Sequence, residues 1–149
     1  MSEWNKYFVT PQEFHDNIIK LANMIPKGKY KYIYAIPRGG LIVGVYLSHY
    51  LELEILDKHD FAVRYTVYLK AKYFKTNDKE TIDDILIVDD LTDTGKTLDP
   101  LIKNGFDVAT IHYKPRSIVK PIYYVEECPN DRWIVYPFEK PDEEPNRDI

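Results

Sequence analysis

Cysteine is nearly absent from this chain of 149 residues, in which Cys128 is the only one. An intrachain disulfide is therefore impossible, a zinc cluster built from several thiolates is disfavoured, and a reducing compartment fits. Long hydrophobic runs are missing as well. No stretch approaches the roughly 18 apolar residues of a membrane span, and residues 1–10 lack the apolar segment of a secretory signal. We expect a soluble, unsecreted, cytoplasmic protein without a membrane partner.

An excess of basic residues is also missing. The net charge is −4, and most of it comes from residues 139–149, which contain five acidic and two basic side chains. The remaining chain is close to neutral, which argues against a nucleic-acid partner, because such proteins neutralise many phosphates. An anionic ligand must then be held by a few well-aimed groups. The length predicts one domain, residues 1–138, followed by a flexible acidic tail, residues 139–149.

Hydrophobic periodicity and turn signals predict an α/β fold with a parallel sheet. Thr10, Pro11 and Glu13 form a capping-box start for a first helix that ends near Pro26. Residues 41–51 are typical of a helix packed on a sheet, and a short helix is expected to end at Asn104-Gly105. The expected strands are residues 31–36, 53–56, 61–66, 85–88, 106–112, 122–125 and 133–136. Residues 66–83 show no clean period and are interpreted as a mobile loop or loose hairpin.

The densest group of polar side chains follows the apolar run at residues 85–88. Asp89 and Asp90 come first, and residues 92–97 then offer hydroxyls and backbone N–H groups around Gly95. Ligands of parallel sheets collect at the carboxyl ends of strands. Two carboxylates there can accept hydrogen bonds from ribose hydroxyls or face a divalent cation, and the following turn can cradle a phosphate. The segment therefore predicts a site for a phosphorylated sugar.

This segment has two other interpretations. Gly95-Lys96-Thr97 matches the end of a Walker A loop, but the glycine that such a loop requires five positions earlier is Asp90. A solvated acidic turn capping a helix, with Asp93 or Thr94 as the N-cap, is the structural alternative. Capping does not need so many polar groups, so the functional interpretation is favoured.

Residues 85–98 resemble the signature of the type I phosphoribosyltransferases that binds 5-phosphoribosyl 1-pyrophosphate (PRPP). The resemblance implies that Asp89 and Asp90 contact the ribose hydroxyls and help to hold Mg²⁺. It also implies that the loop clasps the 5′-phosphate and that Asp93 manages the N7 proton of a purine, as the catalytic residue. The PRPP-binding residues implied in this segment are Asp89, Asp90, Leu91, Thr92, Asp93, Thr94, Gly95, Lys96 and Thr97.

Residues 36–40 resemble the pyrophosphate loop of the same family. Pro37, Arg38 and Gly39 are the PRPP-binding residues implied here, and the family often has a non-proline cis peptide that would fall at Pro37-Arg38. Arginine supplies a charged fork for phosphate oxygens, and the glycines let backbone N–H groups approach the leaving group. Without the downstream motif, a plain turn before a helix would be the simpler interpretation of this segment.

The last third of the chain resembles the base-binding part of the bacterial 6-oxopurine enzymes, the hypoxanthine, guanine and xanthine branch. This resemblance implies that Lys114 donates to the oxygen on C6 and that Trp133, followed by Ile134, stacks on the purine. A core aromatic is the ordinary alternative for Trp133. Val135 stands where some xanthine-preferring relatives have an acid, so the preferred purine stays open.

The resemblance, which covers most of residues 30–138, implies a parallel core with a small hood formed by the chain termini. It further implies an Mg²⁺-dependent enzyme of purine salvage, commonly a homo-oligomer, that joins a 6-oxopurine to PRPP and releases pyrophosphate. Residues 66–83 could form a lid over PRPP, with Arg64, Lys70 or Lys72 reaching the pyrophosphate, although a solvated face explains them equally well. The alternatives are a PRPP-sensing regulatory protein with the same fold, or a phosphoribosyltransferase for another base.

Overall fold

The computed structural model describes residues 5–75 and 81–141. The helices are α1 (Pro11–Met24), α2 (Gly39–Leu51), α3 (Lys58–Phe74) and α4 (Asp99–Lys103). The strands are β1 (Asn5–Phe8), β2 (Tyr32–Ala35), β3 (Glu54–Ile55), β4 (Ile85–Val88), β5 (Leu91–Thr92), β6 (Asp107–Tyr113), β7 (Tyr123–Glu127) and β8 (Arg132–Val135). The predicted acidic tail is described only as far as residue 141, so its flexibility stays a prediction.

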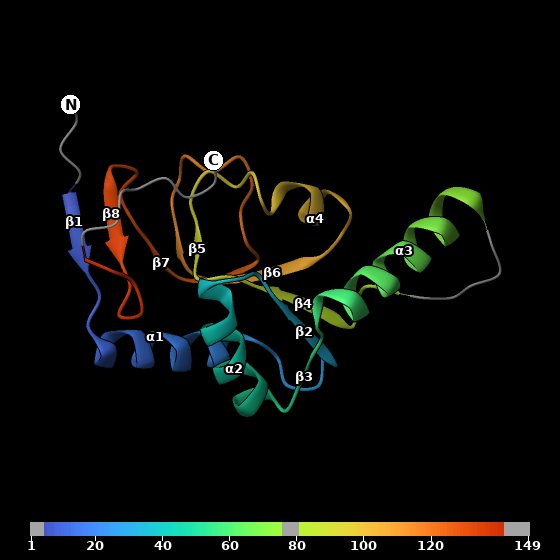
Figure 1. The fold of residues 1–149 in the computed structure, drawn as a ribbon, viewed down its shortest axis with the longest axis horizontal. Coiled ribbons are helices and arrows are strands. Elements are labelled where there is room, and N and C mark those ends of the chain that lie inside the picture. Colours follow the sequence, from blue (N-terminus) through green and yellow to red (C-terminus); the bar gives the residue numbers. More distant parts are fainter. Residues whose placement is uncertain (1–4, 76–80, 142–149) are drawn as a thin grey trace.

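A parallel sheet forms the centre of the molecule, as the alternation of strands and helices predicts. Its strands follow the order β3-β2-β4-β6-β5, and β7 also pairs with β6 (Figure 1). All of these pairings are parallel. β7 pairs along residues 109–113 of β6 and so occupies one edge of that strand. β4 and β5 therefore share its other edge. The chain thus leaves β4, passes residues 89–90 and resumes pairing as β5 against the same neighbour.

Each face of the sheet carries its own hydrophobic core. In β4, Leu86 and Val88 pack in the cluster that includes α1 and α2, whereas Ile85 and Ile87 pack in the cluster that includes Phe61 of α3. All four side chains are buried, which agrees with the prediction of a strand covered on both faces. Burial on both sides fixes the carboxyl end of β4, from which the polar segment leaves.

A second, two-stranded sheet joins the beginning of the described chain to its end. β1 pairs in parallel with β8, and the register places Lys6 opposite Trp133 (Figure 1). Helix α1 follows β1 and is capped at Thr10, whose side chain accepts from the N–H of Glu13 at 3.1 Å, as predicted. We call β1, β8 and the connection into α1 the hood. It agrees with the hood that the family resemblance implies.

The segment from Phe61 to Thr66 is a helix, so the prediction of a strand there is wrong, as is the prediction of a loop or hairpin for residues 66–74. Asp57 caps the start of α3 by accepting from the N–H of Asp60 at 2.7 Å. Phe61, Tyr65 and Tyr68 then recur at helical spacing and pack on the sheet. The many aromatic and β-branched residues obscured this period. Residues 76–80, also part of the predicted loop, lie outside the described residues.

Helix α3 extends beyond the edge of the sheet (Figure 1). Its Arg64 lies 4.3 Å above the ring of Tyr32 and donates to that hydroxyl at 3.2 Å. Tyr32 begins β2, so Arg64 is held near the amino end of the sheet rather than at the PRPP signature. The suggestion that Arg64 reaches the pyrophosphate is therefore not supported by its contacts.

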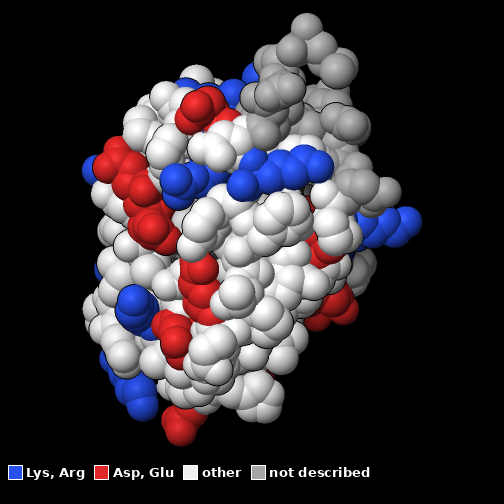
Figure 2. All heavy atoms as spheres, turned by 90° about the vertical axis from the view of Figure 1, so that its left-hand side faces the viewer, with Lys and Arg blue, Asp and Glu red and all other residues white. Residues whose placement is uncertain are grey.

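The surface carries charges of both signs. On the side of the hood, acidic and basic side chains are interspersed among uncharged residues, and some of opposite sign lie next to one another (Figure 2). Within residues 5–75 and 81–141, no helix combines the length and apolar character that crossing a membrane requires.

Candidate active site

The two predicted phosphate-binding segments meet at the carboxyl edge of the sheet. β2 and β4 are neighbours, with Ala35 in register with Val88, so residues 36–40 and 89–90 leave adjacent strands at the same edge. Pro37 and Arg38 are exposed, and the peptide bond between them is cis, as the resemblance implies. Because Arg38 follows β2 while Asp89 and Asp90 follow the neighbouring β4, this edge carries groups suited to phosphate, to sugar hydroxyls and to a cation.

Two glycines allow these segments to touch. A Cβ on Gly39 would lie 2.1 Å from Oδ2 of Asp90, and one on Gly40 would lie 2.6 Å from the carbonyl oxygen of Val88. Such distances are far below van der Waals contact, so neither position accepts a side chain without movement. The Asp90 carboxylate is thus packed directly on the first turn of α2. The side chain of Asp89 accepts from the N–H of Asp90 at 2.8 Å.

The loop after β5 folds back against residues 117–119. Gly95 has φ +84°, a conformation that favours glycine, and a Cβ there would lie 2.3 Å from Oγ of Ser117. The carbonyl of Thr94 accepts from the N–H of Ile118 at 3.0 Å, and that of Gly95 from Asp99 at 2.8 Å. Lys96 and Thr97 are exposed beside this turn. The loop therefore packs closely against residues 117–119 and exposes polar side chains on its outer side.

Asp93 lies at the centre of a charged group. Its Oδ1 is 3.4 Å from Nζ of Lys114, and the same oxygen accepts from Nε of Arg116 at 2.8 Å and from its Nη2. Lys114 is 2% exposed, so its ammonium is almost fully removed from water. Burying such a charge is costly unless a partner neutralises it, and Asp93 is that partner. The structure brings together the predicted catalytic residue and the predicted base-binding lysine.

Sequence reasoning missed Arg116. Its side chain is partly exposed, and its backbone N–H donates to the side chain of Asn130 at 2.8 Å, which ties residue 116 to the turn before β8. The signal available in the sequence was its position two residues after Lys114, across Pro115. With Arg116 included, two cations, Lys114 and Arg116, share the single carboxylate of Asp93.

Trp133 lies in the hood and is 6% exposed. Nζ of Lys6 lies 4.6 Å from the centroid of its ring, so one face of the indole is covered by a cation from β1. Ile134 is 1% exposed and belongs to the core cluster that includes α1 and α2. Its side chain is therefore committed to the core, and only the backbone of this residue is suited to contact a ligand.

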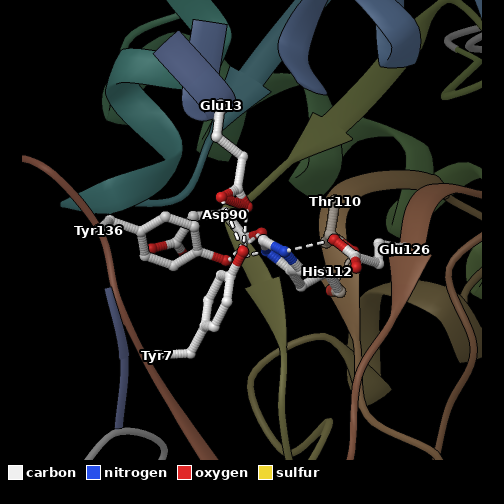
Figure 3. Close-up of polar contacts among 7 residues, drawn as sticks. All are labelled: Tyr7, Glu13, Asp90, Thr110, His112, Glu126 and Tyr136. Carbon is white, nitrogen blue, oxygen red and sulfur yellow. Dashed lines mark hydrogen bonds and ion pairs between the residues drawn. The ribbon is translucent and has the colours of Figure 1, made fainter. Parts of the chain in front are cut away.

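A buried polar group lies beneath the Asp90 segment, at the junction of the hood and the central sheet. Figure 3 shows Tyr136 and His112 pointing toward one another, while Glu13 and Tyr7 approach from α1 and β1. Nδ1 of His112 is 2.8 Å from the hydroxyl of Tyr136, and that hydroxyl donates to the carbonyl of Asp90 at 3.1 Å. Both residues lie in the segments that resemble the base-binding part, residues 112–115 and 133–139, but sequence reasoning gave neither of them a role.

Burial and the neighbouring carboxylates act in opposite directions on the pKa of His112. Burial lowers the pKa of His112, and the carboxylates of Glu126, Glu13 and Asp90 oppose that shift. Glu126 is the nearest of these, with Oε2 3.3 Å from Nε2. The imidazole is thus held between a hydroxyl on one side and a carboxylate on the other.

The donor set suits Mg²⁺ better than a metal that needs a full protein cage. Among the described residues, no group of three or more His, Cys, Asp or Glu side chains could hold a metal ion. Two adjacent carboxylates at Asp89 and Asp90 are, however, what Mg²⁺ uses when the remaining ligands are water and substrate phosphates. The residues present fit that ion together with a pyrophosphorylated substrate.

Comparison with known proteins agrees with this geometry, although no protein-family model matches the chain. A xanthine-guanine phosphoribosyltransferase of Idiomarina loihiensis is 28% identical over 148 residues, covering 90% of this chain and 87% of that protein. The crystal structure of a purine phosphoribosyltransferase from Pyrococcus horikoshii is 28% identical, with a TM-score of 0.68 over 93% of this chain and 98% of that one. A Helicobacter pylori xanthine-guanine-hypoxanthine phosphoribosyltransferase has the same fold, with a TM-score of 0.65 at 18% identity over 90% and 92% of the two chains.

A parallel sheet with two acids at its carboxyl edge, covered by a small hood, agrees with the fold that the resemblance to the type I phosphoribosyltransferases implies. The relatives named above support a purine phosphoribosyltransferase of this type.

Proposed function

We propose that this enzyme transfers the phosphoribosyl group of PRPP to N9 of a 6-oxopurine, giving a purine nucleoside 5′-monophosphate and pyrophosphate. The observation that carries the proposal is the pair formed by Asp93 and the buried Lys114, directly beside a PRPP-type loop. A carboxylate and an ammonium held together match the N7 and O6 edge of a 6-oxopurine. Adenine carries an amino group at C6 and would leave the lysine without an acceptor.

The PRPP half of the site holds the sugar and assists departure of pyrophosphate. Asp89 and Asp90 accept from the ribose hydroxyls, residues 92–97 hold the 5′-phosphate, and Arg38 faces the leaving group. As C1′ loses pyrophosphate, positive charge grows on the ribose and negative charge on the departing oxygen, so these fixed charges stabilise the transition state. Mg²⁺, held by Asp89 and Asp90 when bound, supplies positive charge to the pyrophosphate oxygens.

The base half orients the purine and manages its proton. Lys114 donates to O6, Trp133 covers the ring, and Asp93 accepts the proton at N7 while N9 attacks C1′. Arg116 shares Oδ1 of Asp93 with Lys114, so two cations fix the position of the carboxylate that accepts the N7 proton. Arg116 must give up part of this contact when N7 approaches, which its partly exposed side chain allows.

A cytoplasmic homo-oligomer belongs to the same proposal. Helix α2 exposes Leu41 (46%), Val45 (48%) and Tyr50 (43%), so this helix retains apolar surface that contact with a second copy would cover. Sedimentation of the purified chain will test this part independently of activity.

The decisive assay measures product formation from PRPP and Mg²⁺ with hypoxanthine, guanine, xanthine, adenine, uracil and orotate in turn. We expect turnover with 6-oxopurines and none with uracil or orotate. Turnover with adenine alone would remove the role of Lys114. Binding of PRPP without turnover of any base would favour the PRPP-sensing alternative.

A further inference from the structure

Tyr136 lies where the hood meets the PRPP signature. It directly follows β8 and is 1% exposed. Its hydroxyl donates to the carbonyl oxygen of Asp90 at 3.1 Å, across 46 residues of sequence. A buried hydroxyl placed on the backbone of a substrate-binding residue can control how that residue is oriented.

Hydrogen-bond donors and acceptors fix the direction of this contact. A carbonyl oxygen can only accept, so the single proton of the Tyr136 hydroxyl points to Asp90. Nδ1 of His112, 2.8 Å from the same hydroxyl, must then carry a proton and donate it to the Tyr136 oxygen. The chain of donors runs from His112 through Tyr136 to Asp90, and each member restrains the next.

The ring of Tyr136 has little freedom to move away. It is stacked on Phe138, with ring centroids 5.6 Å apart and planes 1° apart, and the edge of Phe14 from α1 packs against it. Its backbone N–H donates to the carboxylate of Glu139 at 2.9 Å. The ring is therefore placed by packing from α1 and from the turn after β8, in addition to the bond to Asp90.

The Asp90 carbonyl receives donors from two directions. The N–H groups of Ile111 and His112 in β6 reach it at 3.0 and 3.2 Å, and Tyr136 adds a donor from the hood. Asp90 is also the residue whose carboxylate packs on Gly39. Fixing its carbonyl limits rotation of the backbone at residue 90, and so limits where the carboxylate can point.

We propose that Tyr136 is a positioning residue for PRPP binding, whose hydroxyl holds the Asp90 backbone so that the adjacent carboxylates meet the ribose hydroxyls without further ordering. This inference rests on the proposed function and adds to it a residue outside the PRPP signature. Preorganised groups bind more tightly because less freedom is lost on binding. Removal of the hydroxyl alone should therefore weaken PRPP binding while the base site and the chemistry change little.

The test compares Tyr136→Phe with a matched control, Tyr123→Phe. Tyr123 is also buried, at 8% exposure, and its hydroxyl lies 3.0 Å from that of Tyr30, just before β2 begins. Both variants delete one buried, hydrogen-bonded hydroxyl and retain the ring, so a similar loss of stability is expected. For each full-length protein, urea unfolding, calorimetric affinity for Mg²⁺-PRPP without base, and kcat and KM for each substrate are measured.

We expect Tyr136→Phe to weaken Mg²⁺-PRPP binding by about five- to twentyfold, with KM for PRPP rising in parallel and kcat within about twofold. Tyr123→Phe should bind PRPP as the wild type does. Equal affinity in Tyr136→Phe and wild type would overturn the inference, as would an equal loss in the control. If the wild type itself fails to bind Mg²⁺-PRPP, the proposed function is wrong and the inference falls with it.

Discussion

A methyl group added at Gly39 should damage PRPP binding without damaging the fold. The new Cβ would lie 2.1 Å from Oδ2 and 2.5 Å from Cγ of Asp90. To restore ordinary contact the carboxylate must move by about 1 Å, which rotation of a side chain can supply. Loss of a hydrogen bond to a charged group costs about 1.5–3 kcal/mol, which corresponds to about 10- to 100-fold in affinity. We therefore expect Gly39→Ala to lower the affinity for Mg²⁺-PRPP by about 10- to 100-fold.

Stability should respond differently. Gly39 begins α2, where alanine is favoured over glycine by up to about 1 kcal/mol, and this gain offsets the displacement of the Asp90 side chain. The free energy of unfolding of Gly39→Ala should thus stay within about 1 kcal/mol of the wild type. Calorimetric titration with Mg²⁺-PRPP and urea unfolding measure the two quantities separately.

Gly40→Ala is the matched comparison, because its clash involves backbone. Its Cβ would lie 2.6 Å from the carbonyl oxygen of Val88 and 3.1 Å from Cα of Asp89. Neither atom can rotate away, so this variant should lose about 1–3 kcal/mol of stability as well as affinity. Wild-type affinity in Gly39→Ala would show that the Asp90 carboxylate does not hold PRPP. Equal destabilisation by both variants would refute the argument that the Asp90 side chain yields.

Three further outcomes follow from the site. Asp93→Asn should lower kcat by about 10²- to 10⁴-fold with nearly unchanged PRPP affinity, and wild-type turnover would contradict its role in proton transfer. Trp133→Ala should weaken binding of a purine 5′-monophosphate by roughly tenfold or more. The same nucleotide should quench the emission of Trp133, which can be isolated by replacing Trp4, a residue outside the described ones. Burial raises the pKa of the Cys128 thiol to about 11, so alkylation of the folded protein at pH 8 should be slow. Because the unfolded thiol ionises first, near pH 9, stability should fall as pH rises from there toward 11, and Cys128→Ala should show a smaller fall.

Features that depend on neighbouring residues could be predicted from the sequence. The capping box at Thr10, the doubly buried strand β4 and the C-terminal stop of α4 at Asn104-Gly105 each follow from local chemistry, and each is present. The polar segment after β4 could be placed at the carboxyl edge of the sheet for the same reason. Residues 61–66 of α3 were predicted as a strand and residues 66–74 as a loop or hairpin. Their aromatic and β-branched residues favour strands, whereas packing of Phe61 and Tyr65 on the sheet favours a helix.

Contacts between distant segments were beyond the reach of sequence patterns. Arg116 meets Asp93 across 23 residues, and Tyr136 meets Asp90 across 46. No local rule predicts contacts at these sequence separations. The order of strands in the sheet decides which loops face one another. The sequence could supply Asp93 and Asp90 as candidates, but not the distant residues that contact them.

The hood shows why the base half of the proposed site is harder to predict from the sequence than the PRPP half. The proposed PRPP half lies at the ends of β2, β4 and β5, where consecutive residues form motifs that the sequence alone reveals. The base half depends on β8, which pairs with β1 rather than with the central sheet, and the cation over Trp133 comes from Lys6. All four residues of β1 are exposed, so the strand lacks the alternation of buried apolar and exposed polar residues by which strands are recognised in a sequence. In the proposed site, binding of the base thus relies on a strand, β1, that only its pairing with β8 could reveal. The bond from Tyr136, which directly follows β8, to Asp90 connects the hood to the residues that we propose to hold the sugar.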